Sequence, residues 1–180
     1  NLNRQIAHKT INIGFNKAEN LAKECLKINP NISVNFQSSN FDISKDINIF
    51  DIIFDCSDNQ ETKYALNYLS HKHKKILISG SAVQMEGQLS VLKSGLNNTL
   101  PCYECIFPKT TEKAPIINCR EAGIIGSITA FIASMQVSEA IKEIALTNYP
   151  SIAGYLILYD GFSQSLDKIK TVSYTHLTLP

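Results

Sequence analysis

The chain has 180 residues, of which 44% are hydrophobic and 18% are charged, a composition ordinary for one globular domain with its own core. The formal net charge is +1 and basic residues form no stripe apart from residues 72–75, which argues against a nucleic-acid partner. The most apolar stretch, residues 123–137, is interrupted by polar side chains and is too short to cross a bilayer, so we expect a cytoplasmic protein that does not enter membranes.

Helical and extended patterns alternate through the first part of the chain. Asn16 stands three residues before Glu19, a capping arrangement that predicts a helix continuing to about Ile28. Alternating apolar residues predict a half-buried strand over residues 32–36. The short apolar run at residues 49–54 predicts a strand that is buried on both faces.

The second part of the chain repeats this alternation. A helix is expected at residues 60–73, buried strands at 76–78 and 87–92, an apolar helix at 126–146 and a last strand at 155–159. Strands that alternate with helices indicate an α/β domain with a largely parallel, Rossmann-like sheet flanked by helices.

The domain is expected to occupy residues 1–172. The tail at residues 173–180 continues no earlier pattern and resembles a cloning or assembly scar, so we exclude it from the domain.

Charged residues stand where an α/β sheet binds ligands, beyond the carboxyl ends of its strands. Asp55 and Asp58 follow the strand that is predicted to end at Phe54. A carboxylate there could hold Mg²⁺ beside a nucleotide phosphate, or it could cap the next helix. Lys17 in a first helical turn, together with Arg4, could bind phosphates, although a solvated lysine is the commoner case. Two cations and one carboxylate could clamp a triphosphate and its metal, which is most of what phosphoryl or nucleotidyl transfer needs from a protein.

Five cysteines in irregular spacing make a disulfide framework unexpected. Cys102 and Cys105 form a C-x-x-C pair, which in a reducing compartment is typical of a metal or redox site.

An ordered set of short motifs runs through roughly residues 1–170. The motifs are NLNRQ (1–5), GFNKAE (14–19), DCSDN (55–59), SGSA (79–82), EGQ (86–88), CYEC (102–105), NCREAG (118–123), EAIK (139–142) and YDG (159–161). In this order and spacing the chain resembles the ThiF/MoeB/HesA family, which is related to ubiquitin-activating enzymes. Each motif alone is weak, but the ordered set is highly specific.

The resemblance implies ATP- and Mg²⁺-dependent adenylylation of the terminal glycine of a ubiquitin-like sulfur-carrier protein that ends in Gly-Gly, carried out by a homodimer. On this pattern Arg4 and Lys17 match the cations that bind the phosphates, and Asp58 matches the Mg²⁺-linked carboxylate. The implied nucleotide contacts are Asn1, Arg4, Gln5, Lys17, Asp58 and Asn59.

The resemblance also assigns roles to cysteines. Cys102 and Cys105 match half of the four-cysteine zinc site of the family, and because no second C-x-x-C follows Asp160, we expect an incomplete site that binds zinc weakly. Cys119 matches a cysteine that accepts sulfur or links to the carrier. Arg120 beside it could lower its pKa, although an ordinary loop thiol is an equal alternative.

Two departures from the family stand out. The first strand, Gly-rich turn and helix of the family would precede Asn1, so we expect a sheet without its first β-α-β unit. We therefore expect the 180-residue chain to be inactive and poorly stable, and its full-length parent to be active. Lys63 stands where the family usually has Arg, which keeps the charge but loses bidentate geometry.

Alternatives remain open from the sequence. Residues 118–123 and 159–161 are slightly more like ThiF, of the thiamine pathway, whereas residues 85–88 are more like MoeB, of the molybdopterin pathway. A non-catalytic platform that binds a ubiquitin-like partner is a second hypothesis. A nicotinamide-dependent oxidoreductase is a third, although it would not need a phosphate clamp of Arg4, Lys17 and Asp58.

Overall fold

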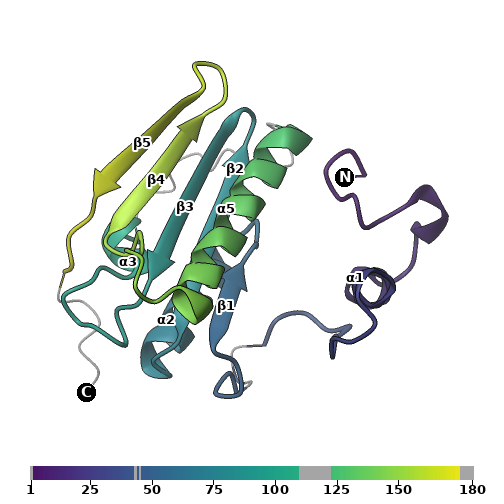
Figure 1. The fold of residues 1–180 in the computed structure, drawn as a ribbon, viewed down its shortest axis with the longest axis horizontal. Coiled ribbons are helices and arrows are strands. Elements are labelled where there is room, and N and C mark those ends of the chain that lie inside the picture. Colours follow the sequence, from purple (N-terminus) through teal and green to yellow (C-terminus); the bar gives the residue numbers. More distant parts are fainter. Residues whose placement is uncertain (1, 43, 45, 110–122, 175–180) are drawn as a thin grey trace. The chain divides into compact units, whose positions relative to one another are not determined.

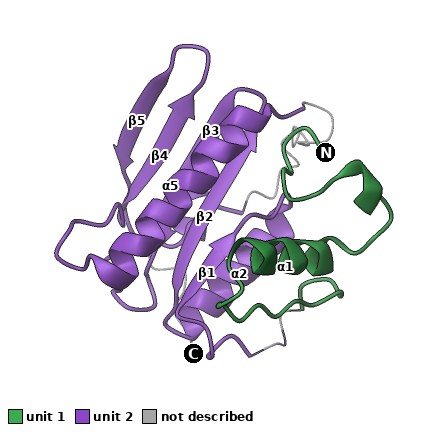
Figure 2. Cartoon of the chain, turned by 45° about the vertical axis from the view of Figure 1, so that its right-hand side comes forward, with its two compact units in different colours: residues 1–42 green, residues 43–180 purple. Residues whose placement is uncertain are grey.

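The computed structural model describes residues 2–42, 44, 46–109 and 123–174. The chain divides into two compact units, residues 1–42 and residues 43–180, coloured separately in Figure 2. Within the described residues no helix is long and apolar enough to span a membrane.

The first unit is built around one capped helix. It contains a 3₁₀ turn, η1 (Thr10–Asn12), and the helix α1 (Lys17–Ile28). The predicted cap is confirmed, because Asn16 Oδ1 accepts a hydrogen bond from the Glu19 N–H at 3.1 Å. The buried Asn20 donates from Nδ2 to the Ala7 carbonyl at 2.9 Å, which ties the preceding segment to the helix.

The strand predicted over residues 32–36 is wrong. This segment has no strand structure, and Ile32 and Phe36 are exposed. An alternating pattern stabilises a strand only where a neighbouring strand accepts and donates its backbone hydrogen bonds, and within the described residues none pairs with this segment.

The second unit contains a five-stranded sheet in the order β1-β2-β3-β4-β5 (Figure 1). The strands are β1 (Ile52–Asp55), β2 (Ile76–Val83), β3 (Glu86–Leu92), β4 (Tyr155–Asp160) and β5 (Ser165–Lys170). The expected α/β, Rossmann-like class is confirmed, but the sheet is mixed rather than largely parallel. Only β1 and β2 pair in parallel, and the other three pairings are antiparallel.

Connection lengths explain three of the four strand pairings. The helix α2 (Gln60–Lys72) provides the long crossover that a parallel pair requires. A tight turn at Gln84 and Met85, with Gln84 at φ 53°, joins β2 to β3 and forces them antiparallel. A second turn, in which Asp160 Oδ1 accepts the Phe162 N–H at 2.8 Å, adds the edge strand β5, which the sequence pattern had not predicted.

Two layers of helix cover the two faces of the sheet. The long helix α5 (Gly126–Ala145) lies along one face, as Figure 1 shows. The core cluster between α5 and the sheet contains Ile78, Leu89, Val91, Ala140 and Ile157. On the opposite face, α2 and the short helix α3 (Tyr103–Ile106) pack through a second cluster of Leu66, Leu77, Leu92 and Tyr103. Leu77 and Ile78 thus point to opposite faces, as successive strand residues must.

Candidate functional site

The carboxyl end of β1 carries a buried carboxylate with four donors. Asp55 Oδ2 accepts from Lys63 Nζ at 2.8 Å and from Ser79 Oγ at 2.7 Å. Asp55 Oδ1 accepts from the Ser57 N–H at 3.0 Å and from Ser57 Oγ at 2.6 Å. The Asp55 side chain is 1% exposed and that of Lys63 is 8% exposed, so this is a buried ion pair.

The electrostatics of this pair affect its neighbours. Burial alone would raise the pKa of Asp55, but the Lys63 ammonium and the hydrogen bonds from Lys63, Ser57 and Ser79 hold it below its usual value. Burial, and after it the Asp55 charge, raises the pKa of the Tyr103 hydroxyl. Asp55 is therefore an anion whose charge is compensated inside the protein.

A glutamine from α5 fixes the same strand end from the other face. Gln136 Nε2 donates to the Asp55 carbonyl at 3.2 Å and to the Ile78 carbonyl at 3.1 Å, bridging β1 and β2. The close approach requires glycine at position 80, where a Cβ would lie 2.5 Å from Gln136 Cδ.

Beyond this anchored strand end, the turn to α2 exposes Asp58. The cap of α2 is Asn59, whose Oδ1 accepts the Thr62 N–H at 2.8 Å, so the capping alternative for Asp58 does not hold. Asp58 is exposed at the carboxyl edge of the parallel strand pair. Mg²⁺ binds through one or two carboxylates together with phosphates and waters, so this single carboxylate fits the donor chemistry of a magnesium ion.

The other candidates for nucleotide binding lie in the first unit. Lys17 is exposed at the first position of α1, and Gln5 is half-buried. Arg4 is half-buried, with Nη1 3.4 Å from Asn3 Oδ1. The convergence of Arg4 and Lys17 with Asp58 stays a prediction. Asn1 and Cys119 lie outside the described residues, and so do their predicted roles.

The cysteine pair has the geometry of two metal ligands. Cys102 and Cys105 are buried, and their Sγ atoms are 3.6 Å apart. Two thiolates at 2.3 Å from a tetrahedral zinc ion would be about 3.8 Å apart, so the pair fits two corners of such a site. Within the described residues no group of three or more histidine, cysteine or acidic side chains could complete it. The Tyr174 N–H lies 3.3 Å from Cys105 Sγ.

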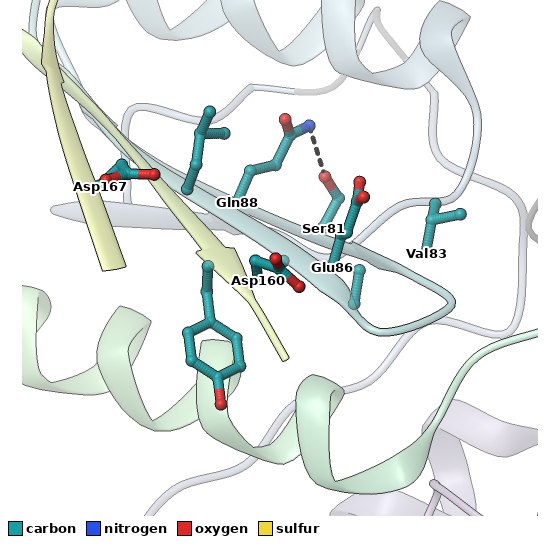
Figure 3. Close-up of a pocket in the computed structure, with 10 residues that line it drawn as sticks. Ser81, Val83, Glu86, Gln88, Asp160 and Asp167 are labelled. Atoms are coloured by element: carbon teal, nitrogen blue, oxygen red, sulfur yellow. Dashed lines mark hydrogen bonds between the residues drawn. The ribbon is translucent and has the colours of Figure 1, made fainter. Parts of the chain in front are cut away.

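A pocket of about 350 Å³ opens on the sheet face away from α5. Gly87 packs against Ile132 of α5, so its neighbours Glu86 and Gln88 point to the other side, into the pocket. Figure 3 shows Gln88 donating to Ser81 Oγ, at 2.7 Å. The acidic lining residues are Glu86, Asp160 and Asp167.

Sequence reasoning missed two features of this region. It noted Lys63 as a change of residue type but gave it no partner, and it did not foresee the pocket. Its signal in the sequence is three polar residues, Ser81, Glu86 and Gln88, on the two sides of the turn between β2 and β3. The predicted strands ended at residue 78 and began at residue 87, so they did not place these residues side by side.

Comparisons with known proteins agree on one family. The sequence model of the ThiF family matches residues 1–177. The chain is 35% identical over 173 residues to "Adenylyltransferase and sulfurtransferase MOCS3" of Drosophila grimshawi, with 94% of this chain and 38% of that protein covered. It is 37% identical over 164 residues to the protein of the same name from Caenorhabditis briggsae, with 89% and 40% covered. The chain thus spans about two fifths of these relatives.

Solved structures show the same fold. A crystal structure of E. coli MccB with MccA-N7isoASN superposes with a TM-score of 0.80 at 18% identity, covering 99% of this chain and 55% of that one. A second structure, of E. coli MccB with ATP, gives a TM-score of 0.79 at 18% identity, covering 98% and 54%. At this identity the likeness establishes the fold alone.

Proposed function

Because this chain belongs to the ThiF family, we propose that the protein uses ATP to adenylylate the C-terminal carboxylate of a ubiquitin-like sulfur-carrier protein. The observation that carries the proposal is the end of β1, where Asp58 is exposed at the ligand-binding edge of the sheet and Asn59 takes the capping role. The names of the curated relatives, which combine adenylyltransferase and sulfurtransferase, support it.

The chemistry explains the need for these charges. A carboxylate anion that attacks an anionic phosphate is repelled unless cations lie close to the reacting atoms. Arg4 and Lys17 would bind the phosphates and stabilise the charge that develops at the α-phosphorus. Asp58 would hold Mg²⁺, which when bound neutralises phosphate charge. Asn1, Gln5 and Asn59 would contact the nucleotide, in a role that is one of positioning.

The pocket on the sheet face away from α5 supports a protein substrate. Asp55, the last residue of β1, pairs with Ser79 of β2. The pocket lining begins at Ser81, only two residues further along β2. An extended carrier tail lying in this pocket would have its terminal carboxylate near the carboxyl edge of β1 and β2. The carrier is either ThiS-like, for thiamine synthesis, or MoaD-like, for molybdopterin synthesis.

A homodimer is part of the proposal. Ala130, Ser134, Val137, Ile141 and Ile144 are exposed along α5 at alternating four- and three-residue intervals. This spacing places them on one side of the helix, opposite the face that packs on the sheet, and is the repeat by which helices pair. A second copy of α5, related by two-fold symmetry, would cover this stripe with the same residues.

The cysteines complete the proposed assignment. Cys102 and Cys105 would supply two thiolate ligands to a structural zinc ion. Cys119 would accept sulfur or link to the carrier, a role assigned by its place in the family pattern alone.

ATP–pyrophosphate exchange tests the proposal. The purified full-length protein should exchange label between pyrophosphate and ATP only with Mg²⁺ and a carrier ending in Gly-Gly. Arg4→Ala, Lys17→Ala and Asp58→Asn should each lower the rate roughly 10²- to 10³-fold, the usual effect of removing one group that stabilises developing charge.

Lys23→Ala is the matched control for the lysine. Lys23 is another exposed cation of α1, paired at 2.7 Å with Glu19, and its removal should leave exchange unchanged. A carrier that lacks its last glycine should support no exchange. Exchange with neither a ThiS-like nor a MoaD-like carrier would favour a non-catalytic platform that only binds the carrier.

A further inference from the structure

The buried ion pair at the end of β1 has a geometry that points beyond its own stability. We propose that Asp55 and Lys63 are positioning residues, which fix the turn at residues 56–59 so that Asp58 is held ready for Mg²⁺. This inference rests on the proposed function, because it concerns how the chain prepares the carboxylate that would bind the metal.

Asp55 itself has no capacity left for a metal. A carboxylate offers about four acceptor positions. In Asp55 they are taken by Lys63 Nζ, Ser79 Oγ, the Ser57 N–H and Ser57 Oγ. Of the two acidic residues at this strand end, Asp58 is therefore the one whose oxygens can reach a ligand, and the work of Asp55 is done inside the protein.

The donors come from three different elements. Lys63 lies on α2, Ser79 on β2 and Ser57 in the turn itself. Ser57 donates both its N–H and its hydroxyl, so Asp55 binds the turn at the residue that immediately precedes Asp58. Gln136 holds the Asp55 carbonyl from the opposite face of the sheet. The strand end is thus fixed from both faces, while Asp58, three residues beyond Asp55, stays exposed.

Energetics favour a positioning role over a stabilising one. Replacing a buried ion pair with apolar residues of similar size is often neutral or even stabilising, because both charges must be taken out of water. An apolar pair could not, however, accept two hydrogen bonds from Ser57. The ion pair therefore orients the turn at residues 56–59, which apolar side chains at the same place would not do.

The test separates orientation from stability. The double variant Asp55→Leu with Lys63→Met replaces the pair with apolar side chains, and Ser57→Ala removes only the hydroxyl donor. Hydrogen–deuterium exchange of the Ser57 amide should speed up at least tenfold in the double variant, while its melting temperature stays close to that of the unchanged protein.

A matched control is available at another ion pair of the same unit. Lys93, which directly follows β3, pairs with Glu143 at 2.9 Å. Lys93→Met should leave exchange of the Ser57 amide unchanged. If the double variant keeps the protection of Ser57, or if Lys93→Met loses it equally, the positioning role is refuted whether or not the protein proves active.

The metal provides a second readout. The Mg²⁺ concentration that gives half-maximal pyrophosphate exchange should rise about tenfold in the double variant and less in Ser57→Ala. Absence of pyrophosphate exchange in the unchanged full-length protein would overturn the proposed function but not the hydrogen–deuterium exchange result at Ser57. Pyrophosphate exchange with the same Mg²⁺ dependence in all variants would leave the proposed function intact and overturn the positioning role.

Discussion

At the scale of single residues, the Asp55 carboxylate couples folding to pH. Its pKa in the folded protein is below the usual value, so its contribution to stability is fully present above about pH 4 to 5 and is lost as the pH falls through the folded pKa. Asp55→Asn leaves Lys63 buried without its anion and should cost roughly 3–5 kcal/mol of unfolding free energy at pH 7. Urea unfolding between pH 7 and pH 3 measures it, and the loss should shrink as the pH falls.

Lys63→Met should reverse the direction in which the pKa of Asp55 is shifted. Without the ammonium, burial is the dominant influence left on Asp55 and raises its pKa, so this variant should lose less stability than the unchanged protein as the pH falls. Parallel pH profiles for Lys63→Met, Asp55→Asn and the unchanged protein would contradict the assignment of Asp55 as the responsible carboxylate.

The sequence predicted some of these residues and not others for a physical reason. The position of Asp58 followed from its place after a strand, and the Asn16 cap from a local spacing, because both depend on neighbours in the chain. Besides the nearby Ser57, the partners of Asp55 are the hydroxyl of Ser79, 24 residues away, and an amine on the next helix. Which of many lysines meets a buried carboxylate depends on packing, which a local pattern does not contain.

At the scale of elements, α5 and the sheet approach closely because position 87 carries no side chain. A Cβ at Gly87 would lie 2.5 Å from Ile132 Cγ1 and 3.4 Å from Ile128 Cγ2. Gly87→Ala should therefore push α5 from β3 and cost about 1–3 kcal/mol of unfolding free energy, the usual effect of overpacking a core. Chemical denaturation measures the loss.

A double variant tests the mechanism of that loss. Ile132→Ala alone removes buried side-chain atoms and should cost about 2–5 kcal/mol. In the combined variant the new Cβ would occupy space that the Ile132 side chain has left. The loss of unfolding free energy in the double variant should therefore be smaller than the sum of the losses in the two single variants. Simple additivity would show that Gly87 matters through its backbone and not through contact with α5.

Element types were predicted best where one helix or strand buries its own face. The helices α2 and α5 and the strands from β2 to β4 follow such patterns. The helix α1 and the strand β1 were also predicted, but Leu26 and Phe54 are exposed, so β1 is not buried on both faces as expected. Strand direction was not predictable, because it depends on connections such as the turn at Gln84 and Met85. The edge strand β5 was missed because Leu166 and Ile169, its two apolar residues, stand three positions apart and so do not alternate as in a half-buried strand. Both are exposed.

At the scale of the whole molecule, the apolar stripe along α5 leads to the prediction of a dimer. Val137 is 51% exposed, Ile141 49% and Ile144 68%, a line of apolar side chains opposite the face of the helix that packs on the sheet. In a two-fold interface each residue occurs twice. Losing one buried aliphatic side chain, at about 1.5–3 kcal/mol, would then weaken the dimer by roughly 3–6 kcal/mol, or about 10²- to 10⁴-fold in dissociation constant.

Ile141→Glu should accordingly shift the protein from dimer to monomer in sedimentation velocity at micromolar concentration, since it also brings two like charges together at the two-fold axis. Leu166→Glu, on the exposed edge strand β5 and 51% exposed, is the matched control and should leave the dimer unchanged. Monomeric unchanged protein, or equal dissociation by both variants, would remove α5 as the interface. The helix would then need another partner, because the exposed residues of its stripe, Ala130, Ser134, Val137, Ile141 and Ile144, carry no charge.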